Sequence, residues 1–494
     1  MIRALIISMV MALQAGAATY FVNQAGSGAA DGSSLGNAAS IATLNGHTSS
    51  AGDIISLNGT CTSQIIPHDS GSAGNVITYR LESDFDHATA SGFTDGAFKI
   101  TSKNFVRIDG QNAGKIRCTA NGDGLANQAT VFGINLSGCI GVEIVNTLIT
   151  NLYVHVFNTD NTTGARNTQA ITALNCQLLT VSNCFISHAY YGNIWYSDTT
   201  GVRTNWMGFS NTISHCSTAY FISNSGGSDT ISNVTVAGGW IQMGVNWYDT
   251  PNANHIDGIH TATGSGPVMT HLRAIGTKYS GDPSAHSTST IYLTDNLNFV
   301  WIENNYFSAS NNTSAEGFVD FNLNSTAPTL QVNNNTMVGI GTGSGGGIGI
   351  LVHSTASTVV RFKNNIISNV RYGIYDDTGN VGTWDTDYNC FAPIGTCGII
   401  NASFHDTLAE WRTATGAESH SINTDPSLGT DGTIGTSSTA KDAGTTVATV
   451  TVDRYGDSRP QGSAYDIGMD EYTAAAPPVT VDTYRALRWR NLRR

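Results

Sequence analysis

Three short segments of the chain repeat one pattern of apolar and polar positions at a constant interval. Each alternates apolar and polar residues and ends in two Asn, and the copies at 300–305, 330–335 and 360–365 are 30 residues apart. Alternation with a period of two is typical of a β-strand, and a fixed longer period is typical of a solenoid. The pattern predicts an all-β fold, a single-stranded right-handed parallel β-helix of about 30 residues per coil, whose equivalent residues stack about 4.8 Å apart.

Looser copies at 142–146, 179–183 and 268–273 extend the same pattern toward the N-terminus. Stacked Asn side chains can hydrogen-bond along the axis of a solenoid as a ladder. The period therefore predicts one turn column and one buried column, made of Asn304, Asn334 and Asn364, and of Ile302, Val332 and Phe362, respectively.

The first 17 residues have the pattern of a secretory signal. Arg3 precedes an apolar run over 4–13, and Ala15-Gly16-Ala17 forms an A-x-A cleavage site. The run is too short to span a bilayer, and no other segment has the composition of a membrane span. The sequence predicts a secreted or cell-surface protein without a transmembrane segment.

The β-helix is predicted over 18–390, beginning with an N-terminal cap that contains a short helix at 38–44. A β-rich C-terminal region is predicted over 391–472, where 403–406 resembles a capping box before a helix that ends at Gly416. Residues 473–494 form a Pro/Ala linker and a basic tail with five Arg. The tail is interpreted either as solvated or as a segment that attaches the protein to the cell surface.

The eight Cys lack the CxxC spacing of a zinc site. An exported chain can form disulfides, and Cys390 and Cys397, which would close a short loop, are the best candidate pair.

The net charge of the chain is strongly negative. Without Arg3 and the tail beyond 472, the chain has 17 basic and 35 acidic residues. This balance argues against nucleic acid as a partner. It also weighs against an acidic polysaccharide, unless a metal ion or a local basic patch bridges the charge.

The C-terminal region and the N-terminal segment carry motifs of a known group. In order, these are Gly74-Asn75-Val76-Ile77-Thr78-Tyr79, Trp411-Arg412, Gly416, Ser419-His420-Ser421-Ile422, Asp425-Pro426, Asp442-Ala443-Gly444, Arg459-Pro460 and 465–471. The chain thereby resembles secreted bacterial β-helix proteins of the pectate-lyase-like superfamily with a choice-of-anchor Q C-terminal region. The resemblance implies the fold and export. It leaves the chemistry open, because the superfamily includes lyases, hydrolases, esterases, phage spikes and adhesins.

Two loops about one coil apart have Tyr, Asp, Pro and His in the same order, and we expect their equivalent side chains to stack. Their candidate residues are Tyr248, Asp249 and His255 in the first loop, and Tyr279, Asp282 and His286 in the second. Stacking would bring His255 and His286 to a common groove with Asp257. The simplest interpretation is structural: the aromatic and Pro residues decorate a long turn that the Asp residues cap.

A second interpretation is glycan hydrolysis. One carboxylic acid would protonate the leaving oxygen while a carboxylate activates water across about 6.5–9.5 Å. Asp257 and Glu316, two rungs apart, are the candidate pair. The segment 255–260 resembles the Asn-Thr-Asp-Gly-x-Asp motif of polygalacturonases, of which Asp257 is the carboxylate that carries over.

A third interpretation is β-elimination on a uronate glycan. A base must take the C5 proton, and a cation must neutralise the neighbouring carboxylate. Lys278 is the candidate base, and Arg273 lies nearby. Asp249, Asp257 and Asp282 would supply oxygen ligands for Ca²⁺.

Aromatic residues on adjoining coils would give sugar rings flat apolar faces. With His260, Tyr248, Tyr279 and Arg273, Trp247 is a candidate for substrate binding. The sequence thus predicts an exported protein that binds and cleaves a polysaccharide in a groove over 248–320. A non-catalytic carbohydrate-binding surface protein or adhesin is the alternative, and a phage spike is a weaker one.

Overall fold

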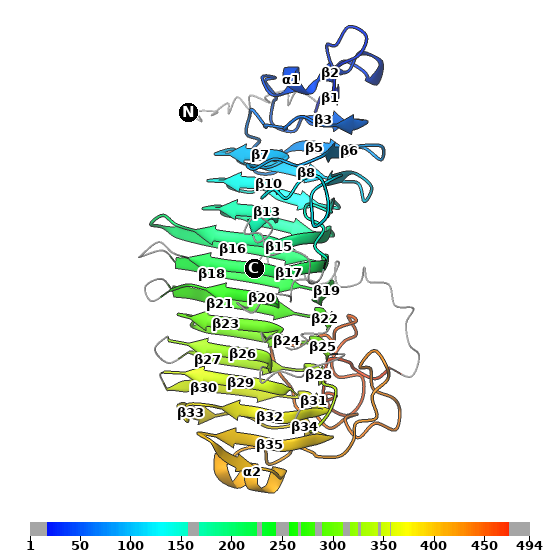
Figure 1. The fold of residues 1–494 in the computed structure, drawn as a ribbon. Helices are drawn as coiled ribbons and strands as arrows, with labels where there is room; N and C mark the ends of the chain where they lie inside the picture. The colour runs from blue at the N-terminus through cyan, green and yellow to red at the C-terminus, as the bar shows by residue number, and fades with distance from the viewer. Residues whose placement is uncertain are drawn as a thin grey trace, which may run out of the picture.

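Short strands stack along one axis in the computed structural model (Figure 1). The structure describes residues 17–156, 167–224, 230–243, 256–264, 268–281, 289–309, 317–324, 328–343, 347–355 and 357–473. Nearly all neighbouring strands pair in parallel, each with the strand one coil earlier and one coil later. The chain is therefore a parallel β-helix, as the 30-residue period predicts.

Each full coil has three faces. The first face is a 14-stranded sheet, whose strands in sheet order are β2 (Ala39–Ser40), β1 (Thr19–Asn23), β3 (Ile54–Leu57), β5 (Ile77–Leu81), β8 (Val106–Asp109), β11 (Glu143–Val145), β14 (Leu179–Ser182), β16 (Val202–Phe209), β18 (Thr230–Ala237), β21 (Val268–Ile275), β24 (Phe299–Glu303), β27 (Thr329–Asn333), β30 (Thr358–Lys363) and β33 (Val381–Trp384).

The second and third faces belong to one 22-stranded sheet, because two long strands cross both faces. The second face contains β4 (Thr60–Cys61), β6 (Asp86–Thr89), β9 (Lys115–Cys118), β12 (Leu148–Thr150), the first halves of β15 (Phe185–Ser197) and β17 (Thr212–Asn224), β19 (Trp240–Met243), β22 (Lys278–Gly281), β25 (Tyr306–Ala309), β28 (Thr336–Val338), β31 (Ile366–Ser368) and β34 (Cys390–Phe391). The third face contains β7 (Phe98–Thr101), β10 (Phe132–Ser137), β13 (Gln169–Leu174), the second halves of β15 and β17, β20 (Asp257–Ala262), β23 (Ile291–Asp295), β26 (Gly317–Leu323), β29 (Ile348–Ser354), β32 (Val370–Asp376), β35 (Ile394–Ile400) and β36 (Ser403–His405).

The predicted register is confirmed. Ile302 pairs with Val332, and Val332 pairs with Phe362. All three side chains are buried, since alternate residues of these strands face the axis. Burying each such side chain contributes about 1.5–3 kcal/mol, so the apolar column stabilises the stacked coils.

The turn between the first and second faces, here called the first corner, carries the Asn residues. Asn304, Asn334 and Asn364 have φ of 57°, 54° and 57°, a left-handed conformation that Asn tolerates better than most residues. They form the predicted turn column. The second Asn of each repeat points into the interior of the solenoid. Asn305, Asn335 and others of this column are fully buried and hydrogen-bond from coil to coil.

The C-terminal region lies along this corner, beside the later coils (Figure 1). Asn304 Nδ2 donates to the carbonyl of Val452 at 2.7 Å, and Asn364 Nδ2 donates to that of Thr445 at 2.7 Å. Arg459, paired with the buried carboxylate of Glu471 at 2.9 Å, also reaches Asn304 Oδ1 at 3.3 Å. The side-chain amides of these left-handed Asn residues thus bind the C-terminal region, which lies more than 80 residues later in the sequence.

The predicted ends of the β-helix need two corrections. Strand β35 still pairs with β32, so the coils reach residue 400 and not 390. Residues 403–405 are the antiparallel strand β36, and the capping box is formed by Thr407 and Glu410 at the start of α2 (Leu408–Thr415). The helix ends at Gly416, with φ 67°, as predicted.

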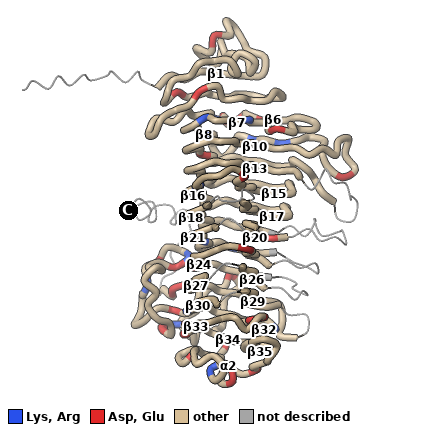
Figure 2. Tube along the Cα trace, turned by 90° about the vertical axis from the view of Figure 1, so that its left-hand side faces the viewer, with Lys and Arg blue, Asp and Glu red and all other residues tan. Residues whose placement is uncertain are grey.

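The N-terminal cap contains a 3₁₀ turn at Leu35–Asn37 and the short helix α1 (Ile41–Leu44), whose N-cap is Ser40. Among the described residues, no helix is long and apolar enough to cross a membrane. Lys and Arg are few along the coils (Figure 2).

The predicted disulfide is wrong. All eight Cys are buried with free thiols. Cys397 faces the main core, whereas Cys390 packs in a separate cluster with residues of the C-terminal region, so the two side chains lie on opposite sides of the wall.

Candidate active site on the third face

Three side chains on successive rungs form one outward column on the third face. His260 on β20 pairs in register with Tyr292 on β23, and Tyr292 pairs with Asp320 on β26. Their neighbours Ile259, Ile291 and others of that inward column are buried in the core. The three functional groups therefore stand about 4.8 Å apart at the backbone, with His260 and Asp320 two rungs apart.

A β-bulge lies at the start of β20, at the second corner, which joins the second and third faces. The N–H groups of Gly258 and Ile259 both donate to the carbonyl of Thr290, at 2.8 and 3.2 Å. A regular strand would send residues three apart to opposite faces. The bulge changes this alternation, so Asp257 and His260 meet on the outer side.

Asp257 fixes the ring of His260. Its Oδ2 lies 2.9 Å from Nδ1 of His260, and the two side chains are 0% and 12% exposed. A buried carboxylate that contacts one ring nitrogen sets the orientation and the tautomer of the imidazole. Asp257 is thus a positioning residue in this arrangement, and His260 is the group nearer to solvent.

Neighbouring side chains frame the column. The ring of His260 lies between those of Phe221 and Tyr292, 5.1 Å from each centroid. Asn322 Nδ2 donates to the hydroxyl of Tyr292 at 3.3 Å, and the side chain of Asn322 is exposed. Ser289 Oγ donates to Asp320 Oδ2 at 3.4 Å, in a buried position.

A second polar cluster lies at the same corner on earlier coils. Asp123 accepts the hydroxyl of Tyr153 at 2.9 Å, and its other oxygen is 2.6 Å from Nδ1 of His155. Tyr153 packs with Tyr190 and Tyr191. The pKa of Tyr191 is raised, first by burial and then by the charges of Tyr190 and Asp257. Tyr191 lies two rungs before Asp257, in register with it through Thr218.

The structure separates several residues that the sequence analysis grouped. Lys278 lies on the outer side of the second face, its Nζ 5.6 Å from the ring of Trp240 and 5.9 Å from that of Tyr306. Arg273 lies on the first face, over the ring of Trp301 at 4.8 Å. Neither shares the face that carries His260.

The prediction of Tyr279 as a substrate-binding residue is wrong. Its side chain is buried in the core and stacks on Phe307, with ring centroids 4.9 Å apart. Strand alternation sends it inward, next to the outward Lys278. Trp195 and Trp206, on earlier coils, are also in the core, whereas Trp240 is 39% exposed.

Seven further candidates lie outside the described residues: Trp247, Tyr248, Asp249, His255, Asp282, His286 and Glu316. The stacking of the two loops and the Ca²⁺ site accordingly stay predictions. Within the described part of the chain, no group of three His, Cys, Asp or Glu side chains is placed to hold a metal ion. Asp257, the described member of the predicted ligand set, already contacts His260.

The sequence analysis missed Tyr292, Asp320 and Asn322. A signal for Tyr292 was present, because it follows Ser289 by three residues just as His260 follows Asp257. On the next coil Gly317 is the residue equivalent to Ser289, and Asp320 follows Gly317 by the same interval of three residues. Aligning these strands residue by residue would have placed His260, Tyr292 and Asp320 in one column.

No protein-family model and no curated protein matches the chain. Among solved structures, the fold is similar to pectate lyase Pel9A, with 16% identity and a TM-score of 0.47 over 93% of this chain and 97% of the other. It is also similar to XylC in complex with xylose, with 10% identity and a TM-score of 0.38 over 91% of this chain and 98% of the other. A GH136 lacto-N-biosidase from Eubacterium ramulus has 10% identity and a TM-score of 0.34 over 82% of this chain and 67% of the other.

Proposed function

We propose that this protein is exported and cleaves a uronate-containing polysaccharide by β-elimination at the His260 column. The observation that carries the proposal is the imidazole of His260, held at Nδ1 by the buried Asp257 and in edge-to-face contact with Tyr292 on the next rung. A positioned base beside a second proton-transfer group is what elimination needs.

His260 is the base that takes the proton from C5 of the uronate. The electron pair of that C–H bond forms the C4–C5 double bond, and the C4–O bond breaks. The leaving oxygen receives the hydroxyl proton of Tyr292, and exchange with water restores both groups. Asn322, whose amide contacts the Tyr292 hydroxyl, is placed to donate a hydrogen bond to the sugar carboxylate.

Calcium is the cofactor that the sequence analysis predicts. A bound Ca²⁺ would neutralise the carboxylate of the uronate. The described residues do not complete a site for it, because Asp257 is engaged with His260. If activity is lost on treatment with a chelator and restored by Ca²⁺, the metal belongs to the mechanism.

Hydrolysis is the second candidate, and the position of Asp320 favours it. The carboxylate of Asp257 lies beside the ring of His260, and Asp320 stands two rungs from His260 in the same column, about 9.6 Å at the backbone. Inverting glycosidases separate their two carboxyl groups by about 6.5–9.5 Å. The burial of Asp257 and Asp320, with residue exposures of 1% and 3%, makes direct contact with a glycosidic oxygen harder than for His260.

A panel of polysaccharides distinguishes the candidates. The purified protein is incubated with uronate and neutral polysaccharides, and both the ultraviolet absorbance of unsaturated ends and the reducing ends are followed. Elimination gives both signals, and only on uronate polymers. Reducing ends alone would show hydrolysis, and binding without either signal would show a non-catalytic carbohydrate-binding protein or adhesin.

A further inference from the structure

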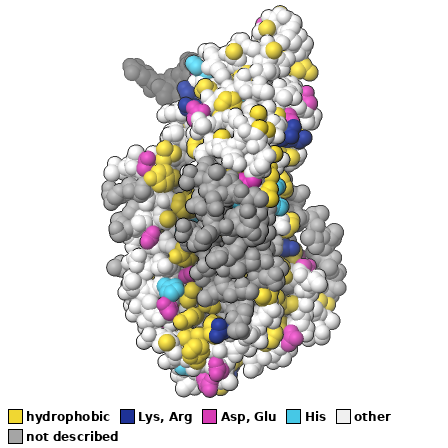
Figure 3. Space-filling view, in the orientation of Figure 1, with side chains coloured by type: hydrophobic (Ala, Val, Ile, Leu, Met, Phe, Trp, Pro, Cys, Tyr) yellow, Lys and Arg dark blue, Asp and Glu magenta, His cyan; other side chains and the backbone are white. Residues whose placement is uncertain are grey.

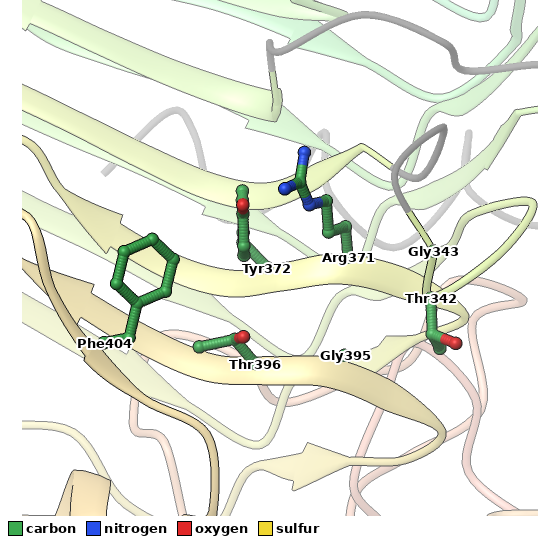
Figure 4. Close-up of a pocket in the computed structure, with 7 residues that line it drawn as sticks. All are labelled: Thr342, Gly343, Arg371, Tyr372, Gly395, Thr396 and Phe404. Atoms are coloured by element: carbon green, nitrogen blue, oxygen red, sulfur yellow. The ribbon is translucent and has the colours of Figure 1, made fainter.

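A pocket of about 290 Å³ lies at the second corner near the α2 end of the solenoid (Figure 4). Its lining comes from four segments that are far apart in sequence: Thr342, Gly343, Arg371, Tyr372, Gly395, Thr396 and Phe404. On the face shown in Figure 3, apolar side chains reach the surface near this end of the molecule. The volume suits a small polar ligand such as one sugar unit of a longer chain.

A second bulge aims two neighbouring residues into this pocket. The N–H groups of Arg371 and Tyr372 both donate to the carbonyl of Gly347, at 2.9 and 3.3 Å. A regular strand would send consecutive side chains to opposite faces. Both side chains instead project from the same side of β32, as Figure 4 shows.

The pocket combines a cation with aromatic faces. The guanidinium of Arg371 lies 4.5 Å from the ring centroid of Tyr372. Phe404 on β36 is 58% exposed, and its ring lies 6.1 Å from that of Tyr372 at an angle of 63°. Such rings offer sugars an apolar face, and stacking on Tyr372 holds the guanidinium in place with its N–H donors directed away from the ring.

Arg371 is a cation without an acidic partner in this part of the molecule. Arg107 and Arg117 each contact a carboxylate, but no carboxylate of the described residues lies within 4.0 Å of Arg371. The acid beside the pocket, Asp406, accepts a hydrogen bond from Thr396 Oγ1 at 2.8 Å. In a chain with 36 acidic and 23 basic residues, such an arginine supplies the local positive charge that an acidic glycan needs.

Two glycines shape the walls. A Cβ on Gly395 would lie 2.6 Å from the carbonyl oxygens of both Arg371 and Thr342, so only glycine allows these segments to approach each other so closely. A Cβ on Gly343 would meet no atom within 4 Å. A side chain added at Gly343 would therefore extend into open space at the rim of the pocket.

We propose that this pocket is a second binding site, for a carboxylate-bearing sugar unit of the same glycan chain. The planar guanidinium of Arg371 pairs with the carboxylate through two parallel hydrogen bonds, and Tyr372 and Phe404 contact the sugar ring. Tyr372 lies in the column that runs from Asp257 through Ser289, Gly317 and Ile348. The pocket is thus four rungs, about 19 Å, from the rung of Asp257 and His260 along one corner.

The inference takes from the proposed function only that the ligand is a glycan, and its test needs no catalysis. Calorimetry measures binding of galacturonate, glucuronate and mannuronate oligosaccharides to the full chain carrying His260→Gln, so that any cleavage activity does not consume the ligand. The same oligosaccharides with their carboxyl groups reduced to alcohols are the matched neutral probes. At least one uronate series is expected to bind, and its reduced form at least tenfold more weakly.

Arg371→Ala in that background is expected to weaken uronate binding about 10- to 100-fold, the usual range for losing hydrogen bonds to a charged group. Arg361→Ala, which removes the same charge from the first face, is the control and leaves binding unchanged. Gly343→Leu tests the pocket without touching its charges, and is expected to block binding.

Equal binding of uronate and reduced probes, equal loss with Arg361→Ala, or no binding of any probe would overturn the site. The two proposals fail separately. If Arg371→Ala abolishes uronate binding but no polysaccharide is cleaved by the unmodified protein, the pocket stands and the elimination chemistry does not.

Discussion

At the scale of single residues, substitutions of His260 and Asp257 test the proposed chemistry most directly. His260→Gln removes the base, and we expect a loss of about 10²–10⁴ in kcat. Asp257→Asn keeps the base but removes the carboxylate that orients it, so kcat falls while KM is preserved. Because substrate binding does not depend on the orientation of the imidazole, the loss should appear in kcat and not in KM.

A merely structural role for Asp257 would lower the melting temperature and leave kcat of the folded enzyme unchanged. Thermal melting of both variants is the accompanying measurement, with Asp376→Asn as the control, since Asp376 is equally buried on β32 and caps a turn by accepting from the N–H of Gly379. A lower melting temperature with an unchanged kcat in Asp257→Asn would contradict the positioning role.

Glu418 sets a pH dependence of stability that is independent of function. Burial raises its pKa to about 7, against hydrogen bonds from Ser421 and Asn389 that favour the ionised form. Because the folded pKa lies above the unfolded one, its contribution is full below about pH 4.5 and is lost as the pH rises through about 7, by up to ~3 kcal/mol. Glu418→Gln retains an acceptor for Asn389 and cannot ionise.

We therefore expect the denaturation midpoint of the unmodified protein to fall between about pH 5 and pH 8, and that of Glu418→Gln to fall less. Some decline should persist, because Asp470 is a second buried carboxyl whose pKa is raised to about 7. Parallel curves for the two proteins would show that Glu418 is not the titrating group.

At the scale of elements, the first corner depends on its buried Asn ladder. Asn335 Nδ2 donates to the carbonyl of Ile302 at 2.8 Å, and its Oδ1 accepts from the backbone N–H of Asn305 at 2.9 Å. Asn335→Ala leaves both backbone groups buried without these partners. Each such group costs about 1–3 kcal/mol, so we expect a loss of more than ~2 kcal/mol in the free energy of unfolding by denaturant titration.

Gln331→Ala, on the outer side of the preceding strand, is the matched control and should change stability by less than ~0.5 kcal/mol. Equal effects of the two substitutions would mean that water replaces the ladder without cost. The bulges at the second corner are the other decisive elements, because they turn Asp257 in one case and Arg371 in the other toward the outer surface.

At the scale of the whole molecule, eight buried thiols are distributed along the solenoid without forming a disulfide. Burial raises the pKa of Cys184, Cys216 and Cys390 to about 12, so these thiols are neither accessible nor ionised at neutral pH. We expect no rapid reaction of the native protein with a thiol reagent, and eight reactive thiols after unfolding in denaturant. Fewer than eight in the unfolded, unreduced protein would reveal a disulfide.

The sequence by itself determined the β-helix, its 30-residue step and the first corner. Ile302, Val332 and Phe362 face the axis, and Asn304, Asn334 and Asn364 share one turn, because strand alternation and a short turn of fixed length leave one register that buries the apolar residues. Gly416 likewise ended its helix through local backbone conformation alone. These features depend on residues that are close in sequence or equally spaced.

Only the tertiary structure decided which residues meet at the second corner. His260, Tyr292 and Asp320 lie 32 and 28 residues apart in the sequence, so a constant step cannot align them. A bulge, which the sequence does not announce, brought Asp257 to His260, and strand direction carried Tyr279 into the core. Lys278 and Arg273, near Asp257 in sequence, lie on other faces because each coil turns the chain around the axis. Side-chain direction at a corner is set by contacts between coils, and a repeat pattern within one chain segment does not contain that information.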